Sequence, residues 1–140
     1  MREKVVKFMH ALNRIDVVYY MREKDSTITD AELCVLYSLD DRKAHTQAEL
    51  CREWSLPKTT VSSIMKRWES EGLVTRDDSS SDKRQRHMKL TKKGISFAKK
   101  HLTPVYEAEE KALSKTIEKY GEDFIEAVLM FGEQLKSELL

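Results

Sequence analysis

Residues 46–74, TQAELCREWSLPKTTVSSIMKRWESEGLV, decide the fold of this chain. Thr46 and Glu49 have the spacing of a capping box, in which the hydroxyl and the carboxylate accept from backbone N–H groups at a helix start. The helix that they open is short, because Ser55-Leu56 indicates a tight turn. Pro57 suits the first position of the next helix, where its missing N–H costs nothing. Two helices joined in this way predict a helix-turn-helix.

A β-hairpin is predicted directly after the second helix. Gly72 is typical of the residue that follows a helix in the left-handed conformation. Leu73–Arg76 and Arg86–Leu90 then form two short β-type runs, and the polar residues 77–85 between them indicate a long tip. A hairpin in this position is a wing, so residues 46–90 predict a winged helix-turn-helix.

Helical patterns flank this segment on both sides. Residues 2–24 repeat apolar side chains every three or four positions, and a second T-x-x-E capping box begins at Thr29. Thr91 starts a long helical segment that Pro104 is expected to kink and Gly121 to break, before a last amphipathic helix. The predicted fold class is therefore mainly α with a small β-hairpin wing, a winged helix-turn-helix between long helices.

Length and composition are those of one globular domain. The chain has 140 residues, of which 35% are charged and 8% aromatic. It contains no apolar run of the roughly 18 residues that a membrane helix needs. The N-terminal segment lacks the apolar centre and the cleavage site of a signal peptide, so a cytoplasmic protein without a membrane partner is expected.

Charge is distributed unevenly along the chain. Residues 57–100 carry 12 Lys or Arg against 5 Asp or Glu, whereas residues 105–140 carry 4 against 9. A basic middle can meet a polyanion, and an acidic end would avoid it. The alternative is that solvated faces vary in charge by chance.

The second helix of the helix-turn-helix has an exposed face suited to DNA. That face is rich in short hydroxyls and carries no acid before Glu69. The alternative is an ordinary solvent-facing helix, but such helices usually carry Glu as well as Lys. In helix-turn-helix proteins the N-terminal part of this helix meets the bases. The predicted DNA contacts on it are Lys58, Thr59, Thr60, Ser62, Ser63, Lys66 and Arg67.

The hairpin supplies a second set of predicted DNA contacts. A guanidinium at the tip, for which Arg84 is the candidate, could enter a narrow minor groove where the potential is most negative. Asp82 could hold that guanidinium by a bidentate pair and so support the wing. The alternative is an ordinary solvated loop. The predicted contacts of the hairpin are Arg76, Lys83, Arg84 and Arg86.

Several motifs together resemble the MarR family of transcriptional regulators. The resemblance covers residues 29–94, and the flanking helices match in length and pattern. The motifs are Thr46-x-Ala48-Glu49-Leu50, Ser55-Leu56-x-x-x-Thr60-Val61-Ser62, Lys66-Arg67-x-Glu69-x-x-Gly72-Leu73-Val74-x-Arg76, Asp82-Lys83-Arg84 and Leu90-Thr91-x-x-Gly94.

The resemblance implies a function and an assembly. Residues 1–140 would be a single MarR-like domain, with residues 29–94 as the DNA-binding part and residues 1–25 and 95–140 as the helical dimerisation part. The protein would be a homodimeric repressor that binds a pseudo-palindromic operator in double-stranded DNA. A small-molecule effector between the two parts could release it. Candidate pocket residues are His10, Asn13 and Tyr37.

Other kinds of site find little support in the sequence. Cys34 and Cys51 lie in apolar helical registers and are expected to be small buried thiols. The four histidines lack ligand spacing, so no metal site and no cofactor are expected. The chain has no nucleotide-binding, nucleophile-elbow or zinc-protease motif, so it is not expected to be an enzyme. The alternative function is a winged-helix protein–protein module without direct DNA readout.

Overall fold

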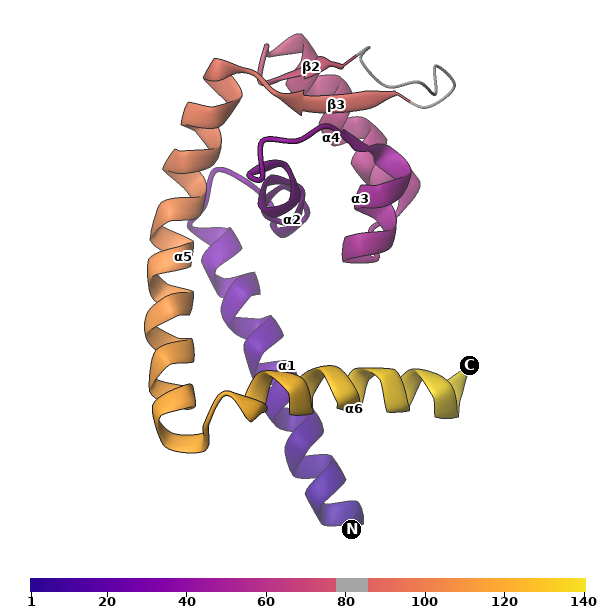
Figure 1. Ribbon diagram of the computed structural model, residues 1–140, viewed down its shortest axis with the longest axis vertical. Coiled ribbons are helices and arrows are strands. Elements are labelled where there is room, and N and C mark those ends of the chain that lie inside the picture. Colours follow the sequence, from indigo (N-terminus) through magenta and orange to yellow (C-terminus); the bar gives the residue numbers. More distant parts are fainter. Residues whose placement is uncertain (78–85) are drawn as a thin grey trace. The chain divides into compact units, whose positions relative to one another are not determined.

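A computed structural model describes residues 1–77 and 86–140 (Figure 1). By their contacts they form two compact units, Met1–Leu102 and Thr103–Leu140. The elements are α1 (Arg2–Lys24), α2 (Asp30–Leu39), β1 (His45–Thr46), α3 (Gln47–Trp54), α4 (Lys58–Ser70), β2 (Val74–Arg76), β3 (His87–Leu90), α5 (Lys92–Tyr120) and α6 (Asp123–Leu139). The described part is mainly helical with a small sheet, which confirms the predicted fold class.

Both predicted capping boxes are present. Thr29 N donates to Glu32 Oε2 at 2.7 Å, and Glu32 N donates to Thr29 Oγ1 at 3.2 Å. Thr46 and Glu49 make the same reciprocal pair at 2.8 and 3.2 Å. Each box satisfies two backbone donors that the start of a helix leaves without partners, so α2 and α3 begin where the sequence predicts.

The turn between α3 and α4 depends on one left-handed residue. Ser55 has φ +51° and its backbone follows the last turn of α3. Pro57 has φ −59° and ψ 140°, which is extended, and its carbonyl accepts from Val61 N at 3.2 Å. Pro57 is therefore the residue before the helix, one position earlier than predicted. The fixed φ of proline suits both positions.

The sheet has a third strand that the sequence analysis missed. The strand order is β1-β3-β2 and both pairs are antiparallel, with Thr46 opposite His87 and Val74 opposite Leu90. β1 has only two residues, too few to show the alternation by which a strand is recognised. It ties the start of α3 to the wing, so the hairpin is fixed to the helix-turn-helix at its base.

The core of the first unit lies between the helices and the sheet. Trp68 of α4 is almost fully buried, and its ring meets Phe97 of α5 edge to face at 5.8 Å between centroids. Leu33, Val35, Leu36, Leu39, Leu50, Val61, Met65, Val74, Ala98 and Leu102 are also fully or almost fully buried. We call the part of the chain from α2 to the first turns of α5 the winged segment. It has a core of its own, against which α4 packs.

The start of α5 is packed directly against the end of α4. Thr91 Oγ1 donates to Gly72 O at 2.6 Å and accepts from Gly94 N at 3.0 Å. A Cβ built on Gly94 would lie 1.9 Å from Leu73 O, so only glycine permits this approach. The predicted helix start at Thr91 is confirmed, and Gly72 has the predicted left-handed conformation with φ +73°.

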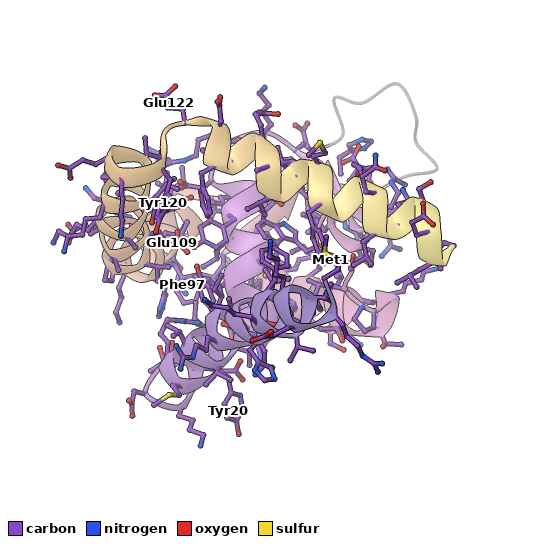
Figure 2. The ribbon with its side chains drawn as sticks, turned by 90° about the horizontal axis from the view of Figure 1, so that it is seen from below. Met1, Tyr20, Phe97, Glu109, Tyr120 and Glu122 are labelled. Atoms are coloured by element: carbon purple, nitrogen blue, oxygen red, sulfur yellow. The ribbon has the colours of Figure 1, made fainter. Side chains whose placement is uncertain are left out.

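The outer helices bury little within the chain. α1 contains no buried residue, and Tyr20 projects outward from it (Figure 2). In the second unit, α6 likewise has no buried residue. α5 continues through Pro104 and ends before Gly121, whose φ of +83° accounts for the predicted break.

Two further features are the burial of the cysteines and the hydropathy of the helices. Cys34 and Cys51 are half-buried rather than buried. The expectation of buried thiols was therefore wrong. Across residues 1–77 and 86–140, no helix has the length and hydropathy needed to span a bilayer.

Candidate nucleic-acid interface

The outward face of α4 carries hydroxyls and cations. Val61, Ile64, Met65 and Trp68 face the core, so the helical period turns the intervening side chains to solvent. The first turn of α4 holds no acidic residue, and the positive end of the helix dipole therefore stands uncompensated there. Lys58, Thr59, Ser62, Ser63 and Lys66 are exposed and Thr60 is half-buried.

A hollow of about 340 Å³ joins α4 to the base of the wing. Lys66 of α4, Arg76 at the end of β2 and Arg86 just before β3 all line it. These three cations are separated by up to 20 positions in the sequence and are brought together by the β2–β3 pairing. The other lining residues are Gln47, Ser62, Glu69 and Met88. We call this set the basic groove.

One acid lies within the basic groove. Arg76 Nε donates to Glu69 Oε1 at 3.1 Å, and both side chains are well exposed. Such a pair in water contributes at most about 1 kcal/mol to stability, but it holds the guanidinium beside α4. The groove keeps an excess of two positive charges, which suits it to phosphate.

Arg67 lies on a different side of α4. Its Nη2 donates to Glu32 Oε1 of α2, and its Nε lies 3.9 Å from Glu71 Oε1. Arg67 also lines a second hollow, of about 360 Å³, with Thr59, Thr60, Ser63, Ile64, Thr29 and Glu32. The structure therefore does not bring Arg67 together with the basic groove.

The winged helix-turn-helix of this chain has known relatives. Residues 26–85 match the model of the MarR family. This segment, which holds most of the winged helix-turn-helix, is therefore similar to the MarR family. Proteins of this family are DNA-binding transcription regulators and not enzymes. The prediction of a DNA-binding regulator and the prediction that the chain is not an enzyme are therefore confirmed at the level of the matched family.

Solved structures share this fold over most of the chain. A MarR family regulator from Neisseria meningitidis is 25% identical, with a TM-score of 0.62 over 94% of this chain and 97% of that one. MepR from S. aureus in its DNA-binding conformation is 19% identical, with a TM-score of 0.73 over 94% and 97%. Wild-type MarR from E. coli is 23% identical, with a TM-score of 0.62 over 96% of each chain. No curated protein matches.

Three residues predicted to act in the wing are not described by the structure. Asp82, Lys83 and Arg84 fall in residues 78–85, outside the described residues. Their roles in the wing stay predictions. Arg86 and Arg76, which flank that segment, are described and lie in the basic groove.

The three candidate pocket residues lie on two helices, α1 and α2. His10 and Asn13 are exposed on α1. Tyr37 of α2 stacks on Trp54 of α3, with 5.5 Å between ring centroids. Neither of the two hollows described above is lined by any of the three. In the part of the chain that the structure describes, no group of three or more His, Cys, Asp or Glu could hold a metal ion.

Sequence reasoning missed two members of the basic groove. Gln47 was treated as the first residue of a helix, and Glu69 as the end of an acid-free face. Both line the groove beside Ser62 and Lys66. The signal for Glu69 was its spacing of three from Lys66, which puts both on neighbouring positions of one helix face.

Proposed function

We propose that this MarR-family regulator is a ligand-responsive repressor that binds a pseudo-palindromic operator as a homodimer. The observation that carries the proposal is the continuous basic surface formed by the outward face of α4 and the basic groove. Each α4 would enter a major groove, and the two helices of a dimer would meet successive grooves about 34 Å apart.

The two parts of that surface have different tasks in the proposal. Thr59, Ser62 and Ser63 are exposed and short, so their hydroxyls can approach base edges closely. Lys66, Arg76 and Arg86 would contact phosphates and fix the register of the protein on the duplex. The predicted tip residue Arg84 would reach the adjacent minor groove.

The exposed apolar side chains of the outer helices support the dimer. Val5, Phe8, Met9, Ile15 and Val18 are exposed on α1, with exposed fractions between 37% and 64%. Phe124, Ile125, Val128, Leu129, Met130 and Leu135 are exposed on α6. A monomer rarely leaves this much apolar surface in water, so burial against a second copy by two-fold symmetry is expected.

The effector part of the proposal has a narrower basis. BpsR from Bordetella bronchiseptica has the same fold, at 17% identity and a TM-score of 0.60, and its DNA binding is regulated by 6-hydroxynicotinic acid. We propose that a small molecule likewise changes the spacing of the two recognition helices in this chain. Such a ligand acts only through different affinities for the two conformations.

Fluorescence anisotropy against the DNA upstream of the chain's own gene tests the proposal. Scrambled DNA of the same length is the control, and both are titrated over a salt series. Binding that is at least about 1000-fold tighter to the upstream DNA supports an operator-binding dimer. Weak and equal binding to both would instead favour a winged-helix module for a protein partner.

A further inference from the structure

The first turn of α2 lies between the outer helix α1 and the recognition helix α4. Arg22 of α1 pairs with Asp30 through Nη2 and Oδ1 at 3.1 Å. Glu23, also of α1, accepts from Asp30 N at 2.9 Å through Oε2. Two residues further on, Glu32 accepts from Arg67 of α4. One helical turn is thus joined to both helices by charged side chains.

Glu32 has two separate tasks at this point. Its Oε2 accepts from Thr29 N in the capping box, while its Oε1 accepts from Arg67 Nη2. The Glu32 side chain is only 8% exposed, whereas that of Arg67 is 51% exposed. A buried carboxylate with one oxygen fixed by the backbone has a defined position, so it can hold a flexible arginine and, through it, the middle of α4.

Arg22 is enclosed at the other side of the same turn. Its Nη1 lies 3.4 Å from Ser26 Oγ and its Nη2 bonds Asp30, while its buried Nε has no hydrogen-bond partner among the described residues. Arg22 therefore follows the position of α2 rather than moving freely in solvent. Any change in the angle between α1 and α2 strains or breaks the Arg22–Asp30 pair.

We propose that Glu32 is a positioning residue that sets the angle of α4 through Arg67, with Asp30 linking the same turn to α1. The proposal rests on DNA binding by α4. It replaces the predicted role of Arg67 as a DNA contact. Arg67 acts on DNA binding by holding α4 rather than by touching phosphate.

Glu32→Gln distinguishes a positioning role from a purely electrostatic effect of Glu32 on DNA, because the two predict opposite changes in operator affinity. Gln keeps the capping box, since it is accepted at that position, but removes the ion pair. Loss of a negative charge near α4 should by itself strengthen binding to DNA. The positioning role requires a loss of operator affinity, of about five- to ten-fold. Glu71→Gln is the matched control, because it removes one exposed acid beside Arg67 and should not weaken binding.

The salt dependence of binding tests the role of Arg67. Arg67→Met should weaken operator binding with an unchanged slope of log K against log salt, whereas Lys66→Met, which removes a phosphate contact, should lower that slope by about 1. Glu32→Gln combined with Arg67→Met should cost no more than the larger single change. A reduced slope for Arg67→Met, or full additivity, would overturn the proposal.

Asp30→Asn tests the link to α1. It removes the charge that pairs with Arg22 but keeps the backbone bond to Glu23. Operator affinity should fall about three-fold, less than for Glu32→Gln. Unchanged affinity overturns the part of the proposal that involves α1.

Hydrogen exchange of the free protein tests the effect of Glu32 on α4 without DNA. Glu32→Gln should speed exchange in α4 but not in the body of α5, and unchanged exchange in α4 would overturn the proposal. Wild-type protein that fails to prefer its upstream DNA would contradict the proposed function alone. Thermal unfolding of each variant ensures that the folded state is compared.

Discussion

The winged segment and the two outer helices α1 and α6 differ in how they use apolar side chains. Every buried apolar residue of the described chain lies between Ile28 and Val105. α1 and α6 have none, although both are long and carry many apolar side chains. The first region completes its core by itself, whereas the outer helices leave apolar side chains exposed, which is the surface that the proposed dimer would bury.

The largest expected effect comes from breaking the core of the winged segment. Trp68→Ala should lower the free energy of unfolding by about 3–5 kcal/mol, because it leaves a cavity between α4 and α5. Lys99→Ala on α5, an exposed position outside the proposed dimer contact, is the matched control. Chemical denaturation at several protein concentrations measures both. A loss below about 1 kcal/mol for Trp68→Ala would contradict the separate core.

The outer helices should respond to protein concentration instead. Leu129→Glu puts a charge on the exposed apolar face of α6, where 59% of Leu129 is accessible. The dimer should dissociate at least about ten-fold more readily, since a buried charge at an interface is strongly unfavourable. Analytical ultracentrifugation over a dilution series measures this.

A control and a contrary result sharpen that comparison. Glu133→Gln on the same helix changes an exposed acid and should leave the dissociation constant almost unchanged. If Leu129→Glu sediments like the wild type at every concentration, α6 is not part of the dimer contact.

A smaller effect is expected at the start of α3, where Thr46 caps the helix. Thr46→Ala removes the hydroxyl that accepts from Glu49 N at 3.2 Å and should cost about 1 kcal/mol of stability. Thr46→Ser keeps the hydroxyl and should retain most of it. Thermal unfolding compares the three proteins. Equal losses for both substitutions would show that the methyl group, and not the capping bond, matters.

The smallest effect concerns pH. Burial lowers the pKa of His101 below its ordinary value of 6.5, with the positive charges of Lys100 and Arg22 adding to this. The folded protein therefore binds this proton less readily than the unfolded chain. Stability should be complete above pH 6.5 and decline as the pH falls through the window below it.

His101→Gln isolates this contribution. The melting temperature of the variant should fall less than that of the wild type between pH 7.5 and pH 5.5. His101 is half-buried, with 4.5 Å between its ring centroid and that of Phe97. A wild-type profile as flat as that of the variant would mean that this partial burial does not affect its protonation.

The sequence predicted those features that depend on neighbours in the chain. Capping boxes, the left-handed Gly72 and the apolar face of α4 are local, so their residues identify them directly. β1 and the partner of Arg67 were missed, because each is set by a residue far along the chain. His45 opposes Met88 across 43 positions, and Glu32 meets Arg67 across 35. Nothing in the local pattern names such partners.

In the candidate site, too, the features that local sequence determines were predicted, and those that long-range pairing determines were not. The hydroxyls of α4 were predicted from helical period alone, and the structure exposes all of the predicted contacts except Thr60, which is half-buried. That Arg76 and Arg86 would flank Lys66 required the pairing of β2 with β3. The predicted pocket of His10, Asn13 and Tyr37 had no such support, since residue type without spacing does not bring side chains together.

The separation of exposed apolar side chains from the DNA-facing residues has a genetic consequence. A subunit altered only on α4 keeps the outer faces of α1 and α6 intact. Under the proposed assembly it would still pair with normal subunits and inactivate them, because an operator needs two competent recognition helices. Variants of α4 should therefore be dominant in a cell that also makes the normal protein, whereas variants that prevent pairing should be recessive.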